Sequence, residues 1–464
     1  MSLEGDVRTA TEQILGAEQV TVISHIDADG ITSMSILMQA ITRAGIEATP
    51  VFVRQLEPLM MHRVPEDDSL KVFSDLGAGQ QNLLEERGLT ADEVVIVDHH
   101  VTQDVDTPYL QVNALPYGHT KFSAAGAAYL VAESIDADNR DLAKLAVIGN
   151  VGDMMAREDC GLIGLAREIA GEGIAYGNVE ARRDLNCYGI STRPLATAIA
   201  YTDDPHIEGI TTSPPAVRRL LKDIGVPERT ARGRLRVWED LSADERQAVT
   251  SALAEQIVAH GGSVERLCAE VYLFPDEAER TALHNAAEYS TLLNACGRWA
   301  RPDVGSAICA GDRGEALREA EHMLSHHRST IRELMNHIIE HGVTEGEGVQ
   351  HLHVGDRFPD TVVGIGAGMA LSRLNRDKPI LVMCSLPEDS TLTKVSMRAT
   401  DAMVASGIDL QEALVEACGP FGGAAGGHAI AAGAYIPQKM EKEFVSRVNE
   451  IIRKQRGAAG QNDC

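Results

Sequence analysis

The sequence predicts an α/β protein with two lobes, the larger of which is built on a doubly wound parallel sheet. In the first part of the chain, short apolar runs rich in β-branched residues, such as residues 20–23, alternate with helix-like segments, such as residues 31–44. This alternation is typical of parallel strands covered by helices. Residues 315–339 have the apolar spacing of a long amphipathic helix, and strand-like and helix-like segments alternate again after it. We therefore expect a connector helix followed by a smaller α/β lobe.

Composition and charge limit the classes of function. The 464 residues are enough for two or three domains, and 44% apolar with 24% charged residues is typical of a globular protein. The formal net charge of −26 repels nucleic acid. Any binding of phosphate groups must therefore be local, through metal ions and a few Arg side chains. A salty cytoplasm or a basic protein partner would also account for the acidic excess.

The cysteines and the N-terminal segment predict a cytoplasmic protein. The eight cysteines include no Cys-x-x-Cys pair, so we expect neither a zinc ribbon nor a disulfide framework. The N-terminal segment is acidic and amphipathic, unlike a signal peptide. No apolar run approaches the roughly 20 residues that a membrane span needs, so we expect no membrane association.

Four apolar segments are each followed by Asp or His. These side chains are His25, Asp27 and Asp29 after residues 20–23, Asp75 after 71–74, Asp98, His99 and His100 after 93–97, and Asp153 after 142–148. Because the carboxyl ends of parallel strands meet at one edge of a sheet, we expect these groups to lie together. For one such group alone, an ordinary strand-to-helix loop with Asp as N-cap is an alternative. The recurrence of the pattern favours a shared site.

The chemistry of this set favours a pair of divalent cations. Carboxylates packed together without a counter-charge cost several kcal/mol, roughly, in repulsion and lost hydration. Carboxylate and imidazole ligands without a thiolate suit Mn²⁺ or Mg²⁺ better than structural zinc. Two such ions about 3.5–4 Å apart can hydrolyse phosphate esters, because metal coordination lowers the pKa of water to about 7.

In order and spacing, the segments HIDADG, SDLG, VDHH and GNVGDM resemble the four motifs of the DHH phosphoesterase superfamily. The resemblance implies two sets of metal ligands. His25 and Asp27 would hold one ion, and Asp29, His99 and Asp153 would hold the other. Asp75 would bridge the two ions. It also implies that His100 faces the scissile phosphate and that Asp98 orients its neighbours.

Residues 288–298 contain Asn294, Gly297 and Arg298, which resemble the NA-x-GR motif of RecJ-type single-strand exonucleases in the same superfamily. A guanidinium opposite the metal ions can grip two phosphate oxygens at once. The resemblance implies that Asn294 and Arg298 bind substrate phosphates. We expect no further oligonucleotide-binding domain of the bacterial kind. The resemblance is therefore closer to the shorter archaeal RecJ-like proteins, of the GINS-associated nuclease type.

Two segments of the first lobe carry no predicted chemistry. Residues 120–132 predict a helix of small residues that packs flat on the sheet in a structural role. Residues from about 203 to 286 predict a helical insertion. This insertion is either a structural elaboration or the surface for a protein partner.

The last part of the chain predicts strands at residues 352–356, 361–368, 379–385 and 392–399 and helices at 367–374 and 410–417. A glycine-rich loop at residues 418–428 lets the backbone approach an anion or a base closely. With the S-x-R strand, this loop resembles the DHH-associated DHHA1 domain. The resemblance implies that the substrate strand is clamped by Ser396, Arg398, Gly426, Gly427 and His428.

The expected organisation is a DHH catalytic domain over residues 1–313 with the insertion at about 203–286, a connector helix over 314–345, a DHHA1 clamp domain over 346–455 and a disordered tail over 456–464.

The resemblance implies an exonuclease that uses two metal ions, Mn²⁺ preferred or Mg²⁺, to hydrolyse single-stranded DNA or RNA in DNA replication and repair. Its catalytic residues would be Asp75, Asp98, His100 and Arg298. One alternative is a phosphodiesterase or pyrophosphatase of the same superfamily that acts on small molecules or short oligonucleotides. The other is a replication scaffold that binds the GINS complex, and the complete ligand set disfavours a purely structural role.

Overall fold

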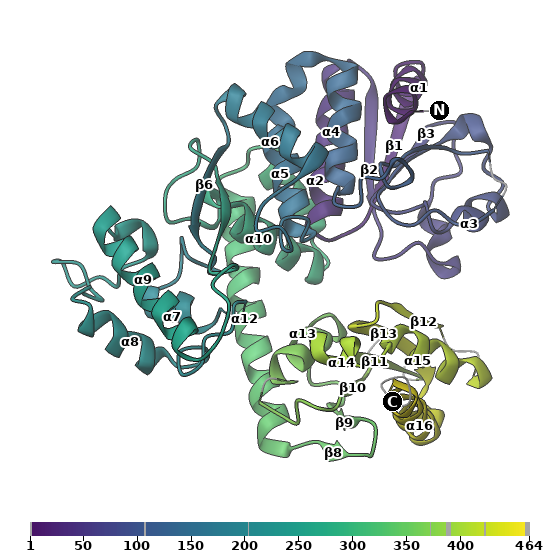
Figure 1. The fold of residues 1–464 in the computed structure, drawn as a ribbon. Helices are drawn as coiled ribbons and strands as arrows, with labels where there is room; N and C mark the ends of the chain where they lie inside the picture. The colour runs from purple at the N-terminus through teal and green to yellow at the C-terminus, as the bar shows by residue number, and fades with distance from the viewer. Residues whose placement is uncertain are drawn as a thin grey trace. The chain divides into compact units, whose positions relative to one another are not determined.

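The computed structural model describes residues 2–105, 108–202, 204–371, 373–386, 391–421 and 424–459. The chain forms two compact units, Met1–Glu321 and His322–Cys464. Figure 1 shows the elements of both units.

A five-stranded parallel sheet forms the centre of the first unit. Its strands are β1 (Gln19–Ser24), β2 (Glu47–Phe52), β3 (Leu70–Ser74), β4 (Val94–Val97) and β5 (Leu110–Val112), in the order β2-β1-β3-β4-β5. The apolar runs that predicted strands correspond to β1, β3 and β4, which are buried along almost their whole length. The strand order reverses between β1 and β3. Open α/β sheets bind ligands at such a reversal, outside the carboxyl ends of the strands.

Helices cover both faces of this sheet, which confirms the predicted doubly wound architecture. They include α1 (Leu3–Leu15), α2 (Ala28–Arg43), α3 (Gln81–Glu86), α4 (Ala124–Ile135), α5 (Ala143–Gly152) and α6 (Gly164–Tyr176). Helices α2, α4 and α5 pack against one another and lie side by side in Figure 1. On the other face, Ile23 and Phe73 of the strands share a buried cluster with Leu84 of α3.

Two sequence expectations in this unit are wrong. The fourth apolar segment, residues 142–148, lies almost entirely in the buried helix α5 and not in a strand. A short run that is apolar throughout fits a buried helix and a buried strand equally well. The small-residue helix α4 packs mainly on α2 and α5, and not flat on the sheet, because its small side chains allow helices to approach closely.

The predicted insertion forms a subdomain with a core of its own. Strands β6 (Glu180–Leu185) and β7 (Cys268–Leu273) pair antiparallel at its base, and between them lie α7 (Leu195–Ala200), α8 (Pro214–Asp223) and α9 (Ala243–Ala259). Trp238 is fully buried in a cluster with Leu221 and Leu253. The sequence indicated the helices but not the two-stranded base. Helices α10 (Ala286–Arg298), α11 (Pro302–Cys309) and α12 (Glu315–His341) follow.

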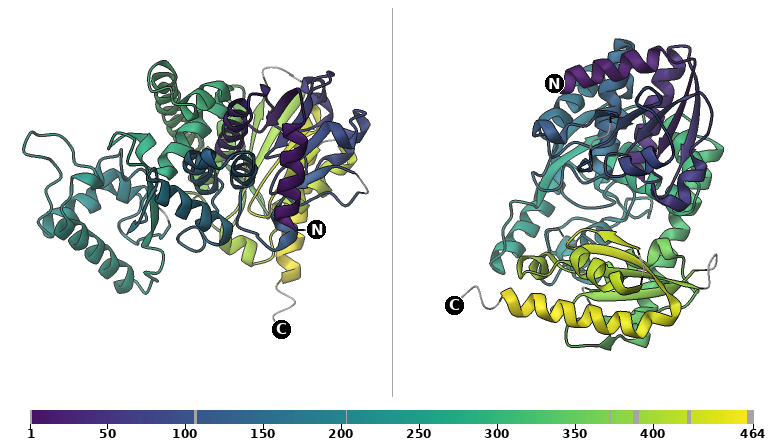
Figure 2. Two further views of the ribbon diagram at one scale, coloured as in Figure 1. Left: turned by 90° about the horizontal axis from the view of Figure 1, so that it is seen from above. Right: turned by 90° about the vertical axis from the view of Figure 1, so that its right-hand side faces the viewer.

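A six-stranded mixed sheet forms the second unit. Its strands are β8 (Thr344–Glu345), β9 (Gln350–His353), β10 (Ile380–Ser385), β11 (Leu392–Arg398), β12 (Ala424–Gly427) and β13 (Ala431–Pro437), in the order β12-β13-β11-β10-β9-β8. The helices are α13 (Asp360–Leu371), α14 (Asp401–Ala405), α15 (Leu410–Cys418) and α16 (Glu441–Ala459), and Figure 2 shows α16 as the long yellow helix. Leu334 and Ile338 of α12 belong to the core of this unit.

Two expectations for the second unit are also wrong. Residues 361–368 belong to α13 and not to a strand. The glycines of this helix leave room for neighbours, since a Cβ on Gly366 would lie 2.4 Å from Leu334. Helix α16 continues to Ala459, so residues 456–459 are helical. The remainder of the predicted tail, residues 460–464, lies outside the described residues. Among the described helices, none combines the length and the apolar character of a bilayer span.

Candidate metal centre

The turn from β1 into α2 places three polar side chains at the carboxyl edge of the sheet. Asp27 is the N-cap of α2, and its Oδ1 accepts a hydrogen bond from the Gly30 N–H at 2.9 Å. Helix α2 therefore begins at Ala28, three residues before the predicted start, and Asp29 lies in its first turn. A Cβ on Gly30 would lie 2.3 Å from the His25 carbonyl oxygen, so only glycine permits this turn. Asp27 is therefore the N-cap of α2 and also a member of the predicted ligand set, so the two interpretations of the sequence do not exclude each other.

His25, Asp27 and Asp75 form one cluster, which we call the first ligand group. His25 Nδ1 lies 3.1 Å from Asp27 Oδ2 and 3.4 Å from Asp75 Oδ2. One nitrogen or oxygen atom from each of the three residues lies within 4.8 Å of the others. Such spacing fits ligands around a single small cation.

Asp29, His99 and Asp153 form the second ligand group. His99 Nε2 lies 3.9 Å from Asp29 Oδ2 and 3.4 Å from Asp153 Oδ2. These residues come from α2, from the segment after β4, and from the C-cap of α5. The helical end of α5 therefore delivers Asp153 to the position that we expected a strand to reach.

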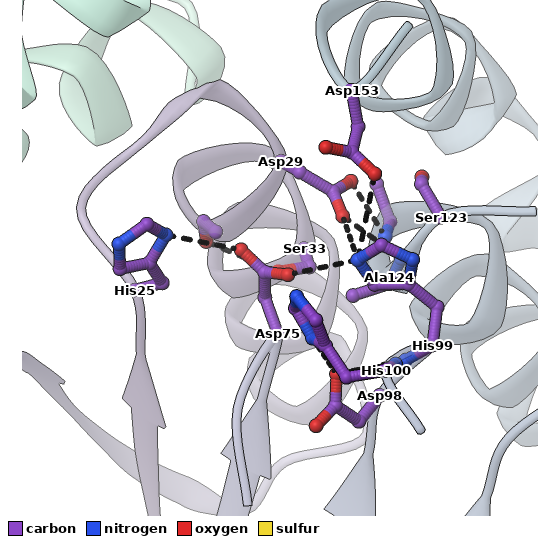
Figure 3. Close-up of polar contacts among 12 residues, drawn as sticks. His25, Asp29, Ser33, Asp75, Asp98, His99, His100, Ser123, Ala124 and Asp153 are labelled. Carbon is purple, nitrogen blue, oxygen red and sulfur yellow. Dashed lines mark hydrogen bonds and ion pairs between the residues drawn. The ribbon is translucent and has the colours of Figure 1, made fainter. Parts of the chain in front are cut away.

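Asp75 lies between the two groups. Its Oδ1 is 3.4 Å from His99 Nε2, while its Oδ2 faces His25. Figure 3 shows this carboxylate pointing from the end of β3 toward both imidazoles. Asp75 has a φ of +60°, a backbone conformation that residues other than glycine adopt rarely. A backbone strained at this position turns the carboxylate into the shared site.

The backbone of α4 holds Asp29, a feature that sequence reasoning missed. Asp29 Oδ2 accepts a hydrogen bond from the Ala124 N–H at 2.9 Å, and Oδ1 accepts one from the Ala125 N–H at 3.0 Å (Figure 3). The first amides of a helix lack partners within the helix and favour a negative charge. The sequence signal was available: Ser123 is an N-cap residue directly before the run of small residues.

Asp98 and His100 form a separate pair beside the second ligand group. The Asp98 carboxylate is buried and accepts hydrogen bonds from the Ala78 N–H at 2.9 Å and the His99 N–H at 2.8 Å. The same carboxylate lies 2.8 Å from His100 Nδ1. The His100 side chain is 55% exposed. Asp98 thus fixes the orientation of an accessible imidazole.

Burial and like charges perturb the pKa values of the clustered groups. Burial, together with the charges of Asp75 and Asp153, raises the pKa of Asp29 well above its ordinary value. Burial also raises the pKa of Asp153 to about 6. Burial disfavours the charged form of His99, but Asp75 and Asp29 outweigh it and raise the pKa of His99 to about 10. Carboxylates raise one another's pKa in this way when too little positive charge lies between them.

The donor set fits divalent cations. Asp29 and Asp75 are 2% and 5% exposed, so water screens their mutual repulsion poorly. A cation between them would offset this repulsion directly. The oxygen and imidazole donors suit Mn²⁺ or Mg²⁺. The residues present therefore fit metal ions, and the Asp75 carboxylate lies between the two groups.

Helix α10 is docked onto the β1–α2 turn. Asn294 Oδ1 accepts a hydrogen bond from the Ala28 N–H at 3.0 Å. A Cβ on Gly297 would lie 1.7 Å from the Ile26 carbonyl oxygen, so glycine is required at this crossing. Burial lowers the pKa of Arg298, while the nearby charge of Asp27 opposes that shift. Asn294 and Gly297 thus position the turn, and they bring Arg298 near the first ligand group.

Comparison with known families follows the same division of the chain. The DHH family, N-terminal domain, matches residues 19–150, the DHH-CID domain matches residues 187–269, and the DHHA1 domain matches residues 346–454. The chain belongs to the DHH/DHHA1 family. The insertion subdomain corresponds to the DHH-CID domain, which the sequence expectation did not name.

The relatives make the chain a RecJ-like member of the DHH/DHHA1 family. It is 27% identical to an uncharacterised protein of Methanocaldococcus jannaschii over 94% of both chains. It is also 28% identical to the single-stranded-DNA-specific exonuclease RecJ of Thermus thermophilus, over 41% of its own length. That match spans 29% of the RecJ sequence.

Solved structures show the same fold. The structure of Thermus thermophilus RecJ in complex with Mn²⁺ aligns with a TM-score of 0.59 at 17% identity, covering 97% of this chain and 55% of RecJ. The structure of CDC45 from Entamoeba histolytica aligns with a TM-score of 0.63 at 11% identity, covering 97% of each chain. At these identities the likeness establishes the fold alone.

In the DHHA1 domain, the predicted clamp residues lie on β11 and β12, which flank β13 in the sheet, and in the turn after β12. Ser396 of β11 and Gly426 of β12 both lie in register with Gly433 of β13. Ser396 is buried, whereas His428 is exposed at the turn between β12 and β13. The Arg398 guanidinium lies over α13, where a Cβ on Gly364 would be 2.4 Å from its Nη2. Gly427 has a φ of +135° at the start of the turn, which requires glycine.

Proposed function

We propose that this RecJ-like DHH/DHHA1 protein is a metal-dependent exonuclease that hydrolyses phosphodiester bonds of single-stranded DNA or RNA. The observation that carries the proposal is the pair of ligand groups with the Asp75 carboxylate between His25 and His99. His25 and Asp27 would hold one cation, Asp29, His99 and Asp153 the other, and Asp75 both. When bound, the two ions would supply an activated water and stabilise the charge that develops on the phosphate.

The protein's own side chains would position the substrate. Asp98 holds Nδ1 of His100, so the other ring nitrogen is available to a phosphate oxygen or to the leaving group. Arg298, near Asp27, would bind phosphate oxygens in a bidentate manner. Five residues of the DHHA1 domain would bind another part of the substrate strand: Ser396, Arg398, Gly426, Gly427 and His428. Because Ser396 is buried, it would act by supporting β11, and the contacts to the strand would come from the other four residues.

The preference for a single strand rests on charge and on the RecJ relative. With a net charge of −26, the surface offers no general attraction to a second strand. The Thermus relative is named as a single-stranded-DNA-specific exonuclease. The test is degradation of DNA and RNA strands labelled at either end, alone and as blunt duplexes, with Mn²⁺ and Mg²⁺ in turn. We expect release of nucleotides from single strands only. Equal rates on duplexes would refute the strand preference.

Substrate length separates this proposal from the alternative of a small-molecule phosphodiesterase. An exonuclease should degrade long strands at rates similar to or above those for dinucleotides. Activity that is confined to dinucleotides would support the alternative.

A second proposal is that the DHH-CID subdomain binds a protein partner such as the GINS replication complex. It contributes no residue to either ligand group within the described chain, and it has its own buried core. Deletion of residues 205–285 would be a poor test, because it removes β7 and exposes Leu195 and Ile199. Charge reversal of the exposed Lys222 and Arg232 is better. Undiminished capture of GINS subunits by this double variant would argue against a role of these two charges.

A further inference from the structure

The loop between β6 and α7, residues 186–194, has a fixed conformation around Arg193. The Arg193 N–H donates a hydrogen bond to the Gly189 carbonyl at 2.8 Å. Gly189 has a φ of +74°, and a Cβ there would lie 2.5 Å from Arg193 Cδ. The Tyr188 N–H donates to Thr202 Oγ1 at 3.2 Å. The side chain of Arg193 therefore folds back over the loop in a space that only glycine leaves open.

Arg193 stacks on the ring of Tyr188, with its guanidinium carbon 4.6 Å from the ring centroid. Such stacking uses the flat face of the guanidinium. The N–H donors lie in the plane of the group and point away from its edge, which is the geometry that binds phosphate oxygens in pairs. The stack thus reduces the number of orientations that Arg193 would lose on binding an anion.

Glu288 of α10 anchors this loop. Its carboxylate accepts hydrogen bonds from the Ser191 N–H at 2.7 Å and from the Thr192 hydroxyl. Glu288 is 2% exposed, so the bonds are formed in a poorly hydrated environment and are strong. Two residues inside the Gly189–Arg193 turn are therefore attached to α10.

The same helix contacts the metal centre along its length. A Cβ on Gly152, the neighbour of Asp153, would lie 2.9 Å from Ser290 Cβ. One turn further, Asn294 caps α2, and Gly297 touches the β1–α2 turn. Glu288, which anchors the Arg193 loop, lies two residues before Ser290 on this helix. The Arg193 loop is therefore attached to the part of α10 that packs beside Asp153, on the helix that also carries Arg298.

We propose that Tyr188 and Arg193 form a second phosphate site, which binds a backbone phosphate of the substrate strand next to the one held at Arg298. This inference rests on the proposed function, since it requires a phosphodiester strand at the ligand groups. A chain with a net charge of −26 can bind such a strand only through local cationic groups. Arg193 is held rigidly where a neighbouring phosphate would pass.

The test is Arg193→Gln in the full chain, with Arg219→Gln as the matched control on the exposed face of α8. We expect KM for a long single strand to rise about tenfold with kcat unchanged, because one charged contact is lost. KM for a dinucleotide should not change. The slope of log affinity against log salt for the long strand should fall by about 0.7, the value for one phosphate on a single strand. Arg219→Gln should change neither quantity.

Two further variants keep the test decisive. Arg193→Lys should retain the salt slope, because the charge remains, but should raise KM, because the planar fork is lost. Tyr188→Ala should raise KM, and Tyr188→Phe should not. A raised KM with an unchanged salt slope in Arg193→Gln would show a merely structural role and overturn the proposal, as would an unchanged KM.

Binding without hydrolysis separates this inference from the proposed function. Anisotropy of a fluorescent single strand, with metal chelated by EDTA, gives the same salt slope without turnover. A reduced slope in Arg193→Gln in a protein that hydrolyses no strand would support the phosphate site and refute the exonuclease. Hydrolysis of long strands with an unchanged slope would support the exonuclease and refute the phosphate site.

Discussion

At the scale of single residues, close backbone contacts hold the candidate site together. Gly297 of α10 touches the carbonyl of Ile26, and Gly30 touches the carbonyl of His25. Neither position tolerates a Cβ, because a carbonyl oxygen on a packed turn cannot move aside as a flexible side chain can. These glycines allow α10 and α2 to pack closely against the β1–α2 turn, which carries His25 and Asp27.

Gly297→Ala tests this packing. We expect a loss of about 1–3 kcal/mol in the free energy of unfolding, the range for overpacking where backbone must shift, and a fall in activity. The measurement is urea-induced unfolding with the nuclease assay in parallel. The control is Gly171→Ala in the middle of α6, where a Cβ meets nothing within 4 Å. That change should stabilise the protein by about 0.5–1 kcal/mol. Equal effects of the two changes would contradict the assigned contact.

Asp75 is the residue that joins the two ligand groups. Asp75→Asn keeps the size of the side chain and removes the charge that both cations would share. We expect turnover to fall by about a hundredfold or more, because several kcal/mol of charge stabilisation depends on the metals. The exposed Asp68→Asn in the same unit is the control and should retain full activity. A near-normal rate for Asp75→Asn would rule out a mechanism that uses both ions.

At the scale of elements, the ends of helices supply and hold the ligand residues of the candidate site. The C-cap of α5 delivers Asp153, the N-cap of α2 is Asp27, and the first amides of α4 hold Asp29. In the DHH-CID subdomain, away from the site, polar side chains also gather at the start of a helix. Ser242 and Glu245 form a capping box at the start of α9, and Arg236 pairs with both oxygens of Glu245 at 2.8 and 2.6 Å.

Glu245→Gln tests the start of α9 and predicts a pH dependence. The bonds from Arg236 lower the pKa of Glu245 from its ordinary 4.5 to about 2. Because the folded pKa is depressed, its contribution to stability is complete above pH 4.5 and is lost as the pH falls toward 2. We expect Glu245→Gln to lose about 1–2 kcal/mol of stability at pH 7. This difference from the unaltered protein should shrink in thermal unfolding below pH 4.5. Glu255→Gln, exposed on the same helix, should show neither effect.

At the scale of the whole molecule, the two units have separate cores and only the first carries ligand groups among the described residues. A ligand that binds only the folded form of one unit stabilises that unit alone. Bound cations would balance the acidic charge of the chain locally at the ligand groups, whereas elsewhere the charged side chains are exposed to water.

Calorimetry with and without metal tests this division. At about one hundred times its Kd, Mn²⁺ should stabilise the first unit by about 2.7 kcal/mol and leave the transition of the second unit unchanged. EDTA should reverse the shift, and Asp153→Asn should weaken it. A shift of both transitions together would show that the units unfold as one, and the absence of any shift would argue against a metal centre.

The sequence by itself determined the fold class, the motif order and the family. Strands β1, β3 and β4 were predictable because β-branched runs between polar ends have few other solutions. The residues of both ligand groups could be named from the motifs. Their meeting followed from the rule that parallel strands end at one edge, except for Asp153, which the end of helix α5 delivers.

Only the tertiary structure decided what the apolar runs at residues 142–148 and 361–368 become. Both runs are largely apolar, so no polar face in the sequence reveals their period, and packing of their small residues against neighbouring helices selects the helical form. It also showed the amides of α4 at Asp29, the loop of Arg193 against Glu288, and the docking of Gly297 on Ile26. Each of these contacts joins backbone or side chains far apart in sequence, and local residue pattern carries no information about such distances.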